Sequence, residues 1–554
     1  MAEPQLASPQ STGRSAKVRR ERLLLIGLAA CDPLMVDRLM QAGRLPHFAR
    51  LRREGAWGTL LAGEPLIAPS LWTTLATGRW PETHGVLDRS MPRPDGGGVM
   101  PVGHAAWHAP SVWQAVAAAQ RHTLTVGWPA TAWPCTHVDQ RFALPTGPDF
   151  DHWAMPLDCV APEELRERLR SLRLHPADVT GLMLAPLVPR LTEVYQYRDA
   201  RLTELAVMLS TTTTLHATAT ELIESEAWDL ACIHYPLLED IQRRFWGGVV
   251  DAAYTFVDAM FGRLLDLVDA ETSVWLVSPS GVRSVGGVPA PSRTGLFAAR
   301  GRWIAAGGVL PPVRLVDVAS SVSARFGLTM ETDGAVIRPL APGRSQRPVS
   351  VATGAKATGA AAQPDRDVTA LRAAGYRDEP TAAQISATTA AHGRWQRGRG
   401  EGLIERGRIG EAEAALRQAR EKLPDDPLVL RRLAMCAVLR SDAAACRELG
   451  RQLVALLPQV AWGYVAVAAG YALDGDAASA WPEMAKAEER GGADAELLVR
   501  LGGVALMLRE DGSATRYFSR ALKLEPGLDG AVQGLAMAGR LAEANEVQRS
   551  NPLA

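Results

Sequence analysis

The stretch LLLIGLAACDP, residues 23–33, places an unbroken apolar run directly before a turn. An apolar run without polar alternation indicates a strand that is buried on both faces, as in a parallel sheet. Three similar runs follow, at LTVGW (124–128), DLACIHY (229–235) and VWLVS (274–278). Helical patterns lie between them, for example at 112–120 and 252–268. This alternation of strand and helix predicts an α/β fold with a mostly parallel sheet flanked by helices.

From residue 393 onward the sequence is helical and repeats every 34 residues. Helix breakers recur at this interval, at Pro424, Pro458, Gly492 and Pro526. Small residues recur at the same interval, at Gly400, Ala434, Ala468 and Gly502. The period and the small-residue columns are similar to those of the tetratricopeptide repeat, in which two helices pack closely in each unit. We expect repeats at 393–426, 427–460, 461–494 and 495–528, with a capping helix at 529–548.

Composition divides the chain into four parts. Residues 1–20 have the polar composition of a disordered tail, 21–342 form the α/β domain, 343–390 a linker with a short helix, and 391–548 an all-α repeat solenoid. Lys+Arg and Asp+Glu each total 60 in the 554 residues. This zero balance argues against a nucleic-acid partner. No apolar run reaches the length of a membrane span.

The cysteine pattern bears on compartment and cofactors. Six cysteines occur, and none forms a C-x-x-C pair. This favours free buried thiols in a reducing compartment over disulfides or a zinc site. We therefore expect a cytoplasmic protein, and no cofactor is predicted.

Several motifs of the N-terminal part share an order with one known family. GLAACDP (27–33) is followed by APSLWTTLATGRWPETHGV (68–86), and later by WDLACIHYPLLEDIQRRFW (228–246) and VSPSGV (277–282). This order resembles the type I phosphodiesterase/nucleotide pyrophosphatase branch of the alkaline phosphatase superfamily. The resemblance implies two divalent metals that activate a Thr or Ser nucleophile and stabilise phosphoryl charge.

The catalytic positions implied by this resemblance hold other residues here. The first metal-binding Asp falls at Ala29, the nucleophile at Ala68, an Asp and His pair at Glu239 and Arg243, the next pair at Pro279 and Ser280, and a late His at Pro291. Alanine and proline carry no side-chain donor for a metal, and an arginine repels a cation. We therefore expect no catalytic residues and no bound metal, which is the pattern of a pseudoenzyme rather than of a hydrolase.

Two alternatives to an inactive site are an anion-binding cleft and a rewired active site. Arg243 and Arg293 are candidates for binding an anion in the former active-site cleft. The simpler interpretation of Arg243 is an i,i+4 salt bridge with Glu239, which we favour. The rival function is a metal-dependent phosphodiesterase or phosphatase with a rewired active site around Ser70 or Ser280. That enzyme requires at least three His, Asp or Glu side chains around Ser70 or Ala68.

The repeats predict a protein-binding groove. By resemblance to the tetratricopeptide family, one face of the first helix of each repeat lines it. The residues on this face are Arg394, Arg397, Glu401, Leu428, Arg431, Met435, Trp462, Val465, Glu496 and Val499. The groove would be basic at its start and apolar later, which suits an extended peptide with an acidic end. An active paralogue is another candidate partner, and the alternative is an array that only stacks on its own N-terminal domain. The leading hypothesis is a cytoplasmic scaffold or regulatory pseudoenzyme.

Overall fold

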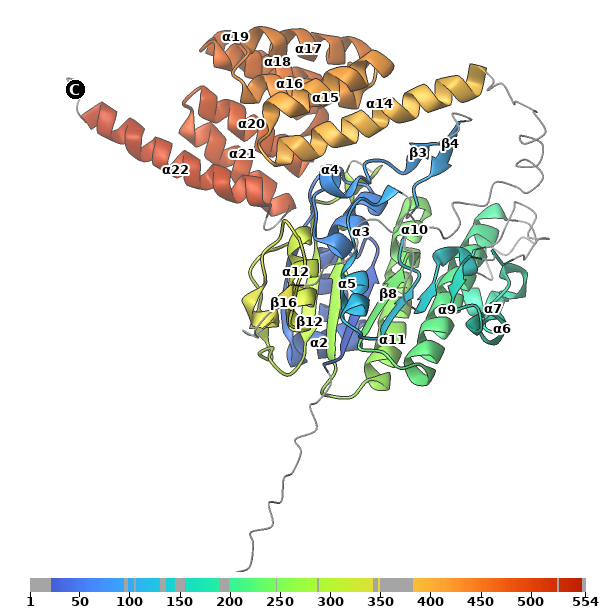
Figure 1. Cartoon of the computed structure of the whole chain (residues 1–554). Helices are drawn as coiled ribbons and strands as arrows, with labels where there is room; N and C mark the ends of the chain where they lie inside the picture. Colours follow the sequence, from blue (N-terminus) through green and yellow to red (C-terminus); the bar gives the residue numbers. More distant parts are fainter. Residues whose placement is uncertain are drawn as a thin grey trace, which may run out of the picture.

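The computed structural model describes most of the chain. The described residues are 21–93, 98–103, 106–129, 136–144, 155–156, 158–188, 191, 199–245, 247–285, 288–341, 347–348, 382–525 and 528–550. Figure 1 shows two parts, an α/β domain and an array of helices that lies over α4 (Pro81–His84) and the hairpin of β3 (Ser90–Pro92) and β4 (Val99–Pro101) of that domain.

The α/β domain is built on one large, mostly parallel sheet. Its strand order is β13 (Gly308–Val309), β2 (Ala56–Leu61), β12 (Thr294–Arg300), β9 (Ser273–Ser278), β1 (Leu23–Leu28), β8 (Leu230–Tyr235), β5 (Thr123–Val126), β6 (Thr136–Val138) and β7 (Val160–Ala161), and β14 (Val313–Arg314) also pairs with β2. The central strands β9, β1, β8, β5 and β6 run parallel, whereas β12 is antiparallel to β9 and β2. The α/β prediction is thus confirmed, and the four predicted strands are β1, β5, β8 and β9.

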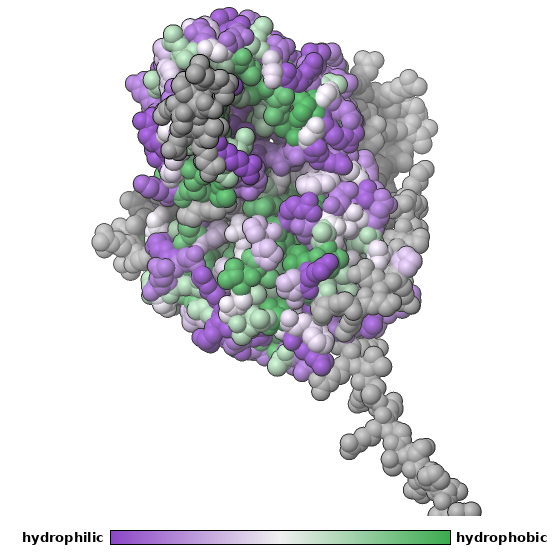
Figure 2. Space-filling view, turned by 90° about the vertical axis from the view of Figure 1, so that its left-hand side faces the viewer, coloured by the Kyte–Doolittle hydropathy of each residue, from purple (hydrophilic) through white to green (hydrophobic). Residues whose placement is uncertain are grey.

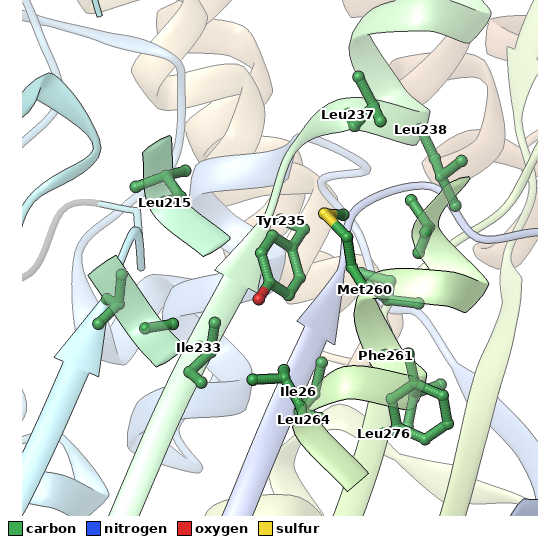
Figure 3. Packing of buried hydrophobic residues seen from close by; sticks show 14 of the residues in the cluster. Ile26, Leu215, Ile233, Tyr235, Leu237, Leu238, Met260, Phe261, Leu264 and Leu276 are labelled. Atoms are coloured by element: carbon green, nitrogen blue, oxygen red, sulfur yellow. The ribbon is translucent and has the colours of Figure 1, made fainter. Parts of the chain in front are cut away.

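Helices cover both faces of the sheet, because alternate residues of β1 point into different cores. Leu24, Ile26 and Leu28 join a buried cluster with helices α1 (Pro33–Gln41), α2 (Pro46–Glu54), α9 (Ala200–Ser225), α10 (Leu237–Arg244) and α11 (Gly248–Leu267). Figure 3 shows this packing of Ile26 beside Leu276 and Phe261. Leu23 and Leu25 join a second cluster with α3 (Ala68–Thr77), α5 (Val112–Ala118) and α12 (Leu315–Arg325). The sheet is therefore buried on both sides, as its unbroken apolar strands require.

The C-terminal helices form antiparallel pairs. They are α14 (Ala382–Glu405) with α15 (Ile409–Lys422), α16 (Pro427–Leu439) with α17 (Ala443–Leu456), α18 (Ala461–Leu473) with α19 (Ala477–Gly491), α20 (Ala495–Met507) with α21 (Asp511–Leu524), and then α22 (Asp529–Ser550). Successive first helices from α16 onward begin 34 residues apart. A Cβ on Gly400 would lie 2.6 Å from Leu416 Cγ, which shows why a small residue is needed there. The array has the form of a tetratricopeptide-repeat solenoid, as predicted.

The first repeat helix is longer than the repeat itself. α14 begins at Ala382, eleven residues before the predicted start of the first repeat, and runs without a break to Glu405. The N-terminal part of α14 contacts β3 (Ser90–Pro92) and β4 (Val99–Pro101). Thr388 Oγ1, for example, donates to the carbonyl oxygen of Gly98 at 3.2 Å. The helical part of the linker is therefore continuous with the repeats and packs on the α/β domain.

Candidate functional site

A cavity of about 140 Å³ lies where β1 and β9 end, and we call it the strand-end cavity. Open parallel sheets bind ligands at this edge. Six of the seven positions identified from the family pattern line it, namely Ala68, Glu239, Arg243, Pro279, Ser280 and Pro291. Ala29 does not, because its side chain belongs to the buried core, and the neighbouring Ala30 lines the cavity instead.

Neutral groups hold the turn after β1 at the cavity wall. The backbone N–H of Cys31 donates to Ser278 Oγ at 2.9 Å, and Gln242 Nε2 donates to the carbonyl oxygen of Ala30 at 2.8 Å. The backbone N–H of Asp32 donates to the hydroxyl of Tyr254 at 2.8 Å. Ala30 has φ +58°, a left-handed conformation that costs about 1 kcal/mol for a residue with a Cβ. The loop is thus fixed by hydrogen bonds.

Ion pairs occupy the charged side of the strand-end cavity. Arg243 pairs with Glu239 one helical turn away, and Arg89 approaches the same carboxylate at 3.9 Å. The neighbouring Asp240 has its pKa raised to about 6, because burial and then the charge of Glu239 disfavour its ionised form. The structure therefore contains the i,i+4 salt bridge that was the simpler interpretation of Arg243.

The residues around this cavity do not fit the two-metal centre that the family pattern implies. Ala68, Pro279 and Pro291 offer no side-chain donor, and the carboxylate of Glu239 already faces two guanidinium groups. Within the described ranges, no group of three or more His, Cys, Asp or Glu side chains is placed to hold a metal ion.

The residues proposed for a rewired site were also located. Ser70 is fully buried in α3, and its hydroxyl has no hydrogen-bond partner among the described residues. The nearest imidazole in the sequence motif, His84, is engaged elsewhere: its Nε2 lies 2.9 Å from Thr74 Oγ1, and its Nδ1 accepts from the backbone N–H of Val86 at 3.1 Å. Burial lowers the pKa of His84 to about 3, so the ring is neutral near pH 7. His84 therefore stabilises the fold around the end of α3.

Arg293 lies outside the strand-end cavity and connects the two domains. Its guanidinium contacts Glu64 of the α/β domain at 2.5 Å, Glu405 of α14 at 2.6 Å and Glu496 of α20 at 2.5 Å. The helices α14 and α20 belong to the first and fourth repeats, so Arg293 reaches across the inner face of the array. These carboxylates outweigh the effect of burial and raise the pKa of Arg293. Arg243 and Arg293 therefore do not share one anion pocket.

A second arginine extends this network. Arg432 of α16 contacts Glu64 at 2.7 Å and Glu401 at 3.1 Å, and all three residues are buried. Burial alone would raise the pKa of Glu64, but Arg432 and Arg293 lower it. We call this network the Arg293 cluster; its members are Arg293, Arg432, Glu64, Glu401, Glu405 and Glu496. It joins the repeats to the α/β domain through charges that are largely removed from water.

Further contacts fix the first repeat helix on the α/β domain. Arg394 contacts Asp88 at 2.9 Å, and Arg406 pairs with Glu82 of α4 (Pro81–His84). A Cβ on Gly398 would lie only 2.1 Å from the carbonyl oxygen of Leu87, so the helix approaches the domain as closely as glycine allows. Of the predicted groove residues, Arg394 and Glu496 thus contact the chain's own N-terminal domain directly, and Glu401 does so through Arg432.

The remaining groove residues form a partly open surface. The guanidinium of Arg431 lies 3.2 Å from the ring centroid of Trp462 and 3.5 Å from Glu496, and burial lowers its pKa to about 10. Leu428 is 44% exposed at the start of α16. The other residues are Met435, which is half-buried, Val465, which is buried, Val499, which is half-buried, and Arg397, which pairs with Asp426 at 3.1 Å.

Four consecutive residues connect the strand-end cavity with the Arg293 cluster. Pro291 lines the cavity, Arg293 centres the cluster, and the hydroxyls of Ser292 and Thr294 each donate to Glu525 of the last repeat at 2.9 Å. The strand-end cavity and the repeats are therefore joined by one short segment.

Comparison with known proteins agrees with this organisation. Residues 23–290 match the family model of type I phosphodiesterase/nucleotide pyrophosphatase. The N-terminal part is therefore a type I phosphodiesterase/nucleotide pyrophosphatase-like domain, and a tetratricopeptide-like repeat region follows it. The search of curated proteins gave no match.

Similar solved structures fall into two groups. Phosphonoacetate hydrolase from Sinorhizobium meliloti is 16% identical with a TM-score of 0.33, and the match covers 48% of this chain and 57% of that enzyme. Murine ectonucleotide pyrophosphatase/phosphodiesterase 5 is 10% identical with a TM-score of 0.37, covering 57% of this chain and 98% of that protein. A tetratricopeptide-repeat protein from Thermus thermophilus is 23% identical with a TM-score of 0.23, covering 29% of this chain and 96% of that protein. The match thus spans little more than half of the hydrolase.

Two further findings concern the surroundings of the protein. No helix in the described part of the chain combines the length and the apolar character needed to cross a membrane. The five described cysteines, Cys31, Cys159, Cys232, Cys436 and Cys446, are all buried.

Proposed function

We propose that this protein is a non-hydrolytic relative of the type I phosphodiesterases, a pseudoenzyme that acts as a protein-binding scaffold or regulatory module through its repeats. The observation that carries the proposal is the composition of the strand-end cavity. Six of the seven positions taken from the family pattern line this cavity, and among them Ala68, Pro279 and Pro291 lie beside an Arg243–Glu239 ion pair. Such a wall can neither clamp two metals nor offer a nucleophile at the expected position.

The partner is a protein or peptide that binds the open part of the repeat groove. The surface formed by Leu428, Arg431, Met435 and Trp462 combines apolar side chains with one guanidinium stacked on an indole ring. Apolar anchors and Arg–aromatic pairs are typical of interface hot spots. The basic start of the groove is already engaged by Asp88 and by Asp426, so the apolar part supplies the anchor. An active relative of the domain is one such partner, and the absence of any C-x-x-C pair among buried cysteines suits a reducing compartment such as the cytoplasm.

Metal content and hydrolysis test the proposal directly. The purified full-length chain is assayed for bound zinc and manganese, and for hydrolysis of bis(p-nitrophenyl) phosphate with either metal added. The expected result is neither stoichiometric metal nor turnover above the buffer rate. A Ser70→Ala variant, which removes only a buried hydroxyl, is the matched control.

Hydrolysis of the phosphodiester by the purified chain would contradict the proposal or reveal a contaminant, and the serine variants distinguish these two cases. Turnover that requires metal and disappears in Ser70→Ala would refute the pseudoenzyme and favour a rewired phosphodiesterase. Turnover that persists in Ser70→Ala and in Ser280→Ala would point to a contaminating hydrolase instead.

A further inference from the structure

A second and larger cavity, of about 300 Å³, lies between the two domains, and we call it the interdomain cavity. One wall comes from β2, α3 and α4 of the α/β domain, and the other from α20 and the start of α22. Figure 2 shows a hollow where the repeats meet the α/β domain, with hydrophilic residues around it. Cavities of this size at domain interfaces are common binding sites for small molecules.

Every charged residue of this cavity but one has an ion-pair or hydrogen-bond partner among the described residues. Within the Arg293 cluster, Arg293 contacts Glu405 at 2.6 Å and Glu496 at 2.5 Å. Arg314 pairs with Asp317 at 2.7 Å, and a carboxylate oxygen of Asp529 accepts from Gln533 Nε2 at 2.7 Å. The polar atoms of these side chains are therefore largely occupied and offer few hydrogen bonds to a ligand.

Arg500 of α20 is the exception. It lines the interdomain cavity, and among the described residues it has neither a hydrogen bond nor an ion pair. Burial lowers its pKa, and the neighbouring charges of Arg293 and Arg432 add to that effect, while Glu496 opposes it. A guanidinium in this position is stabilised by an anion that approaches it through the cavity.

Most of the remaining wall is apolar. The side chains that could contact the body of a ligand are Leu61, Leu71, Trp80, Leu315, Val499 and Leu528. Such a wall favours a ligand with a hydrocarbon or aromatic body.

We propose that the interdomain cavity binds a small organic monocarboxylate, with its carboxylate on Arg500 and its apolar body between Trp80 and Val499. A single negative charge matches the single unpaired guanidinium. A phosphate monoester would bring about two charges close to Glu405, Glu496 and Asp529, and like charges repel at this range. The ligand touches both domains, so its binding stabilises their docked arrangement.

Thermal unfolding of the full-length chain tests this site with defined probes. The probes are acetate, hexanoate and phenylacetate, each compared with its neutral amide at equal concentration. Hexanoate or phenylacetate is expected to raise Tm with a saturable dose response, whereas the amides leave it unchanged. Arg500→Leu is expected to weaken binding by about tenfold or more, as for loss of a charge-assisted hydrogen bond.

Two variants make the result decisive. Val499→Phe keeps Arg500 but fills the apolar part of the cavity, so it should abolish the Tm shift. Arg451→Leu removes an exposed arginine of α17 and should keep it. The proposal is overturned if acids and amides act alike, if either Arg500→Leu or Val499→Phe retains the shift, or if none of the three carboxylates gives a saturable shift.

Discussion

Replacing Arg293 with methionine removes the cation that three carboxylates share, while it keeps an extended side chain of similar length. Glu64, Glu405 and Glu496 lie 2.5 to 2.6 Å from the guanidinium, whose side chain is only 22% exposed. Removing one partner of a buried ion pair typically costs 3–5 kcal/mol, because the other charge remains buried. Since Glu64 keeps Arg432 as a second cation, we expect the lower end of that range, about 3 kcal/mol at pH 7.

This loss of stability weakens the docking of the repeats on the α/β domain, because Arg293 joins the two domains. Small-angle scattering of Arg293→Met at pH 7 should show a larger radius of gyration than the parent chain, and urea unfolding should split into two transitions. Arg302→Met, which alters an exposed arginine of the same domain, should leave both measurements unchanged. A compact Arg293→Met that loses less than about 1 kcal/mol would show that the cluster does not hold the domains together.

Three further results are expected. Gly398→Ala should separate the domains, because its Cβ would lie 2.1 Å from the carbonyl oxygen of Leu87, and scattering would then show a larger radius of gyration. Gly503→Ala, in an open part of α20, should instead raise the free energy of unfolding in urea by up to about 1 kcal/mol and leave the radius of gyration unchanged. Burial lowers the pKa of His234 to about 3, so only the unfolded chain takes up this proton between pH 7 and 5, and this residue alone should cost the folded state about 2 kcal/mol over that range; His234→Gln should reduce the pH dependence of stability by about that amount, while His84 keeps its own contribution, and an unchanged dependence would contradict the assignment. Trp462→Ala should weaken binding of a partner peptide by about tenfold without undocking the domains, and unchanged affinity in a titration would place the partner elsewhere.

The fold could be predicted in some detail because its signals are local. The unbroken apolar run at 23–29 becomes β1, and the 34-residue interval becomes helix pairs that begin at Pro427, Ala461 and Ala495. Motif order also identified seven positions, six of which line the strand-end cavity; among these, Pro279 and Ser280 directly follow β9, and Glu239 and Arg243 lie in α10. Ala29 was the exception, because the residue that faces the cavity is set by the turn after β1 rather than by its place in the motif.

The contacts between the domains could not be predicted in this way. Arg293 and Glu405 are separated by 112 residues, and nothing near either one identifies the other as its partner. One sequence signal does indicate such a contact. Arg432 is the second of two consecutive arginines in the apolar helix sequence LVLRRLAMCAVL (428–439), and a buried arginine in such a helix requires a carboxylate partner. The repeat pattern gives the face of each helix, but the docking surface depends on where a separate domain lies.

The buried state of Glu401 and Arg432 has a practical consequence for identifying partners. Both belong to the repeats, yet Arg432 contacts Glu64 of the other domain, and Glu401 is linked to Glu64 through Arg432. A bait made of the repeats alone would expose these charges to solvent and to every acidic or basic protein in an extract. Interactors captured with such a fragment would report on a surface that the whole chain keeps covered, so the search for partners is best done with the full-length protein and repeated with Arg293→Met.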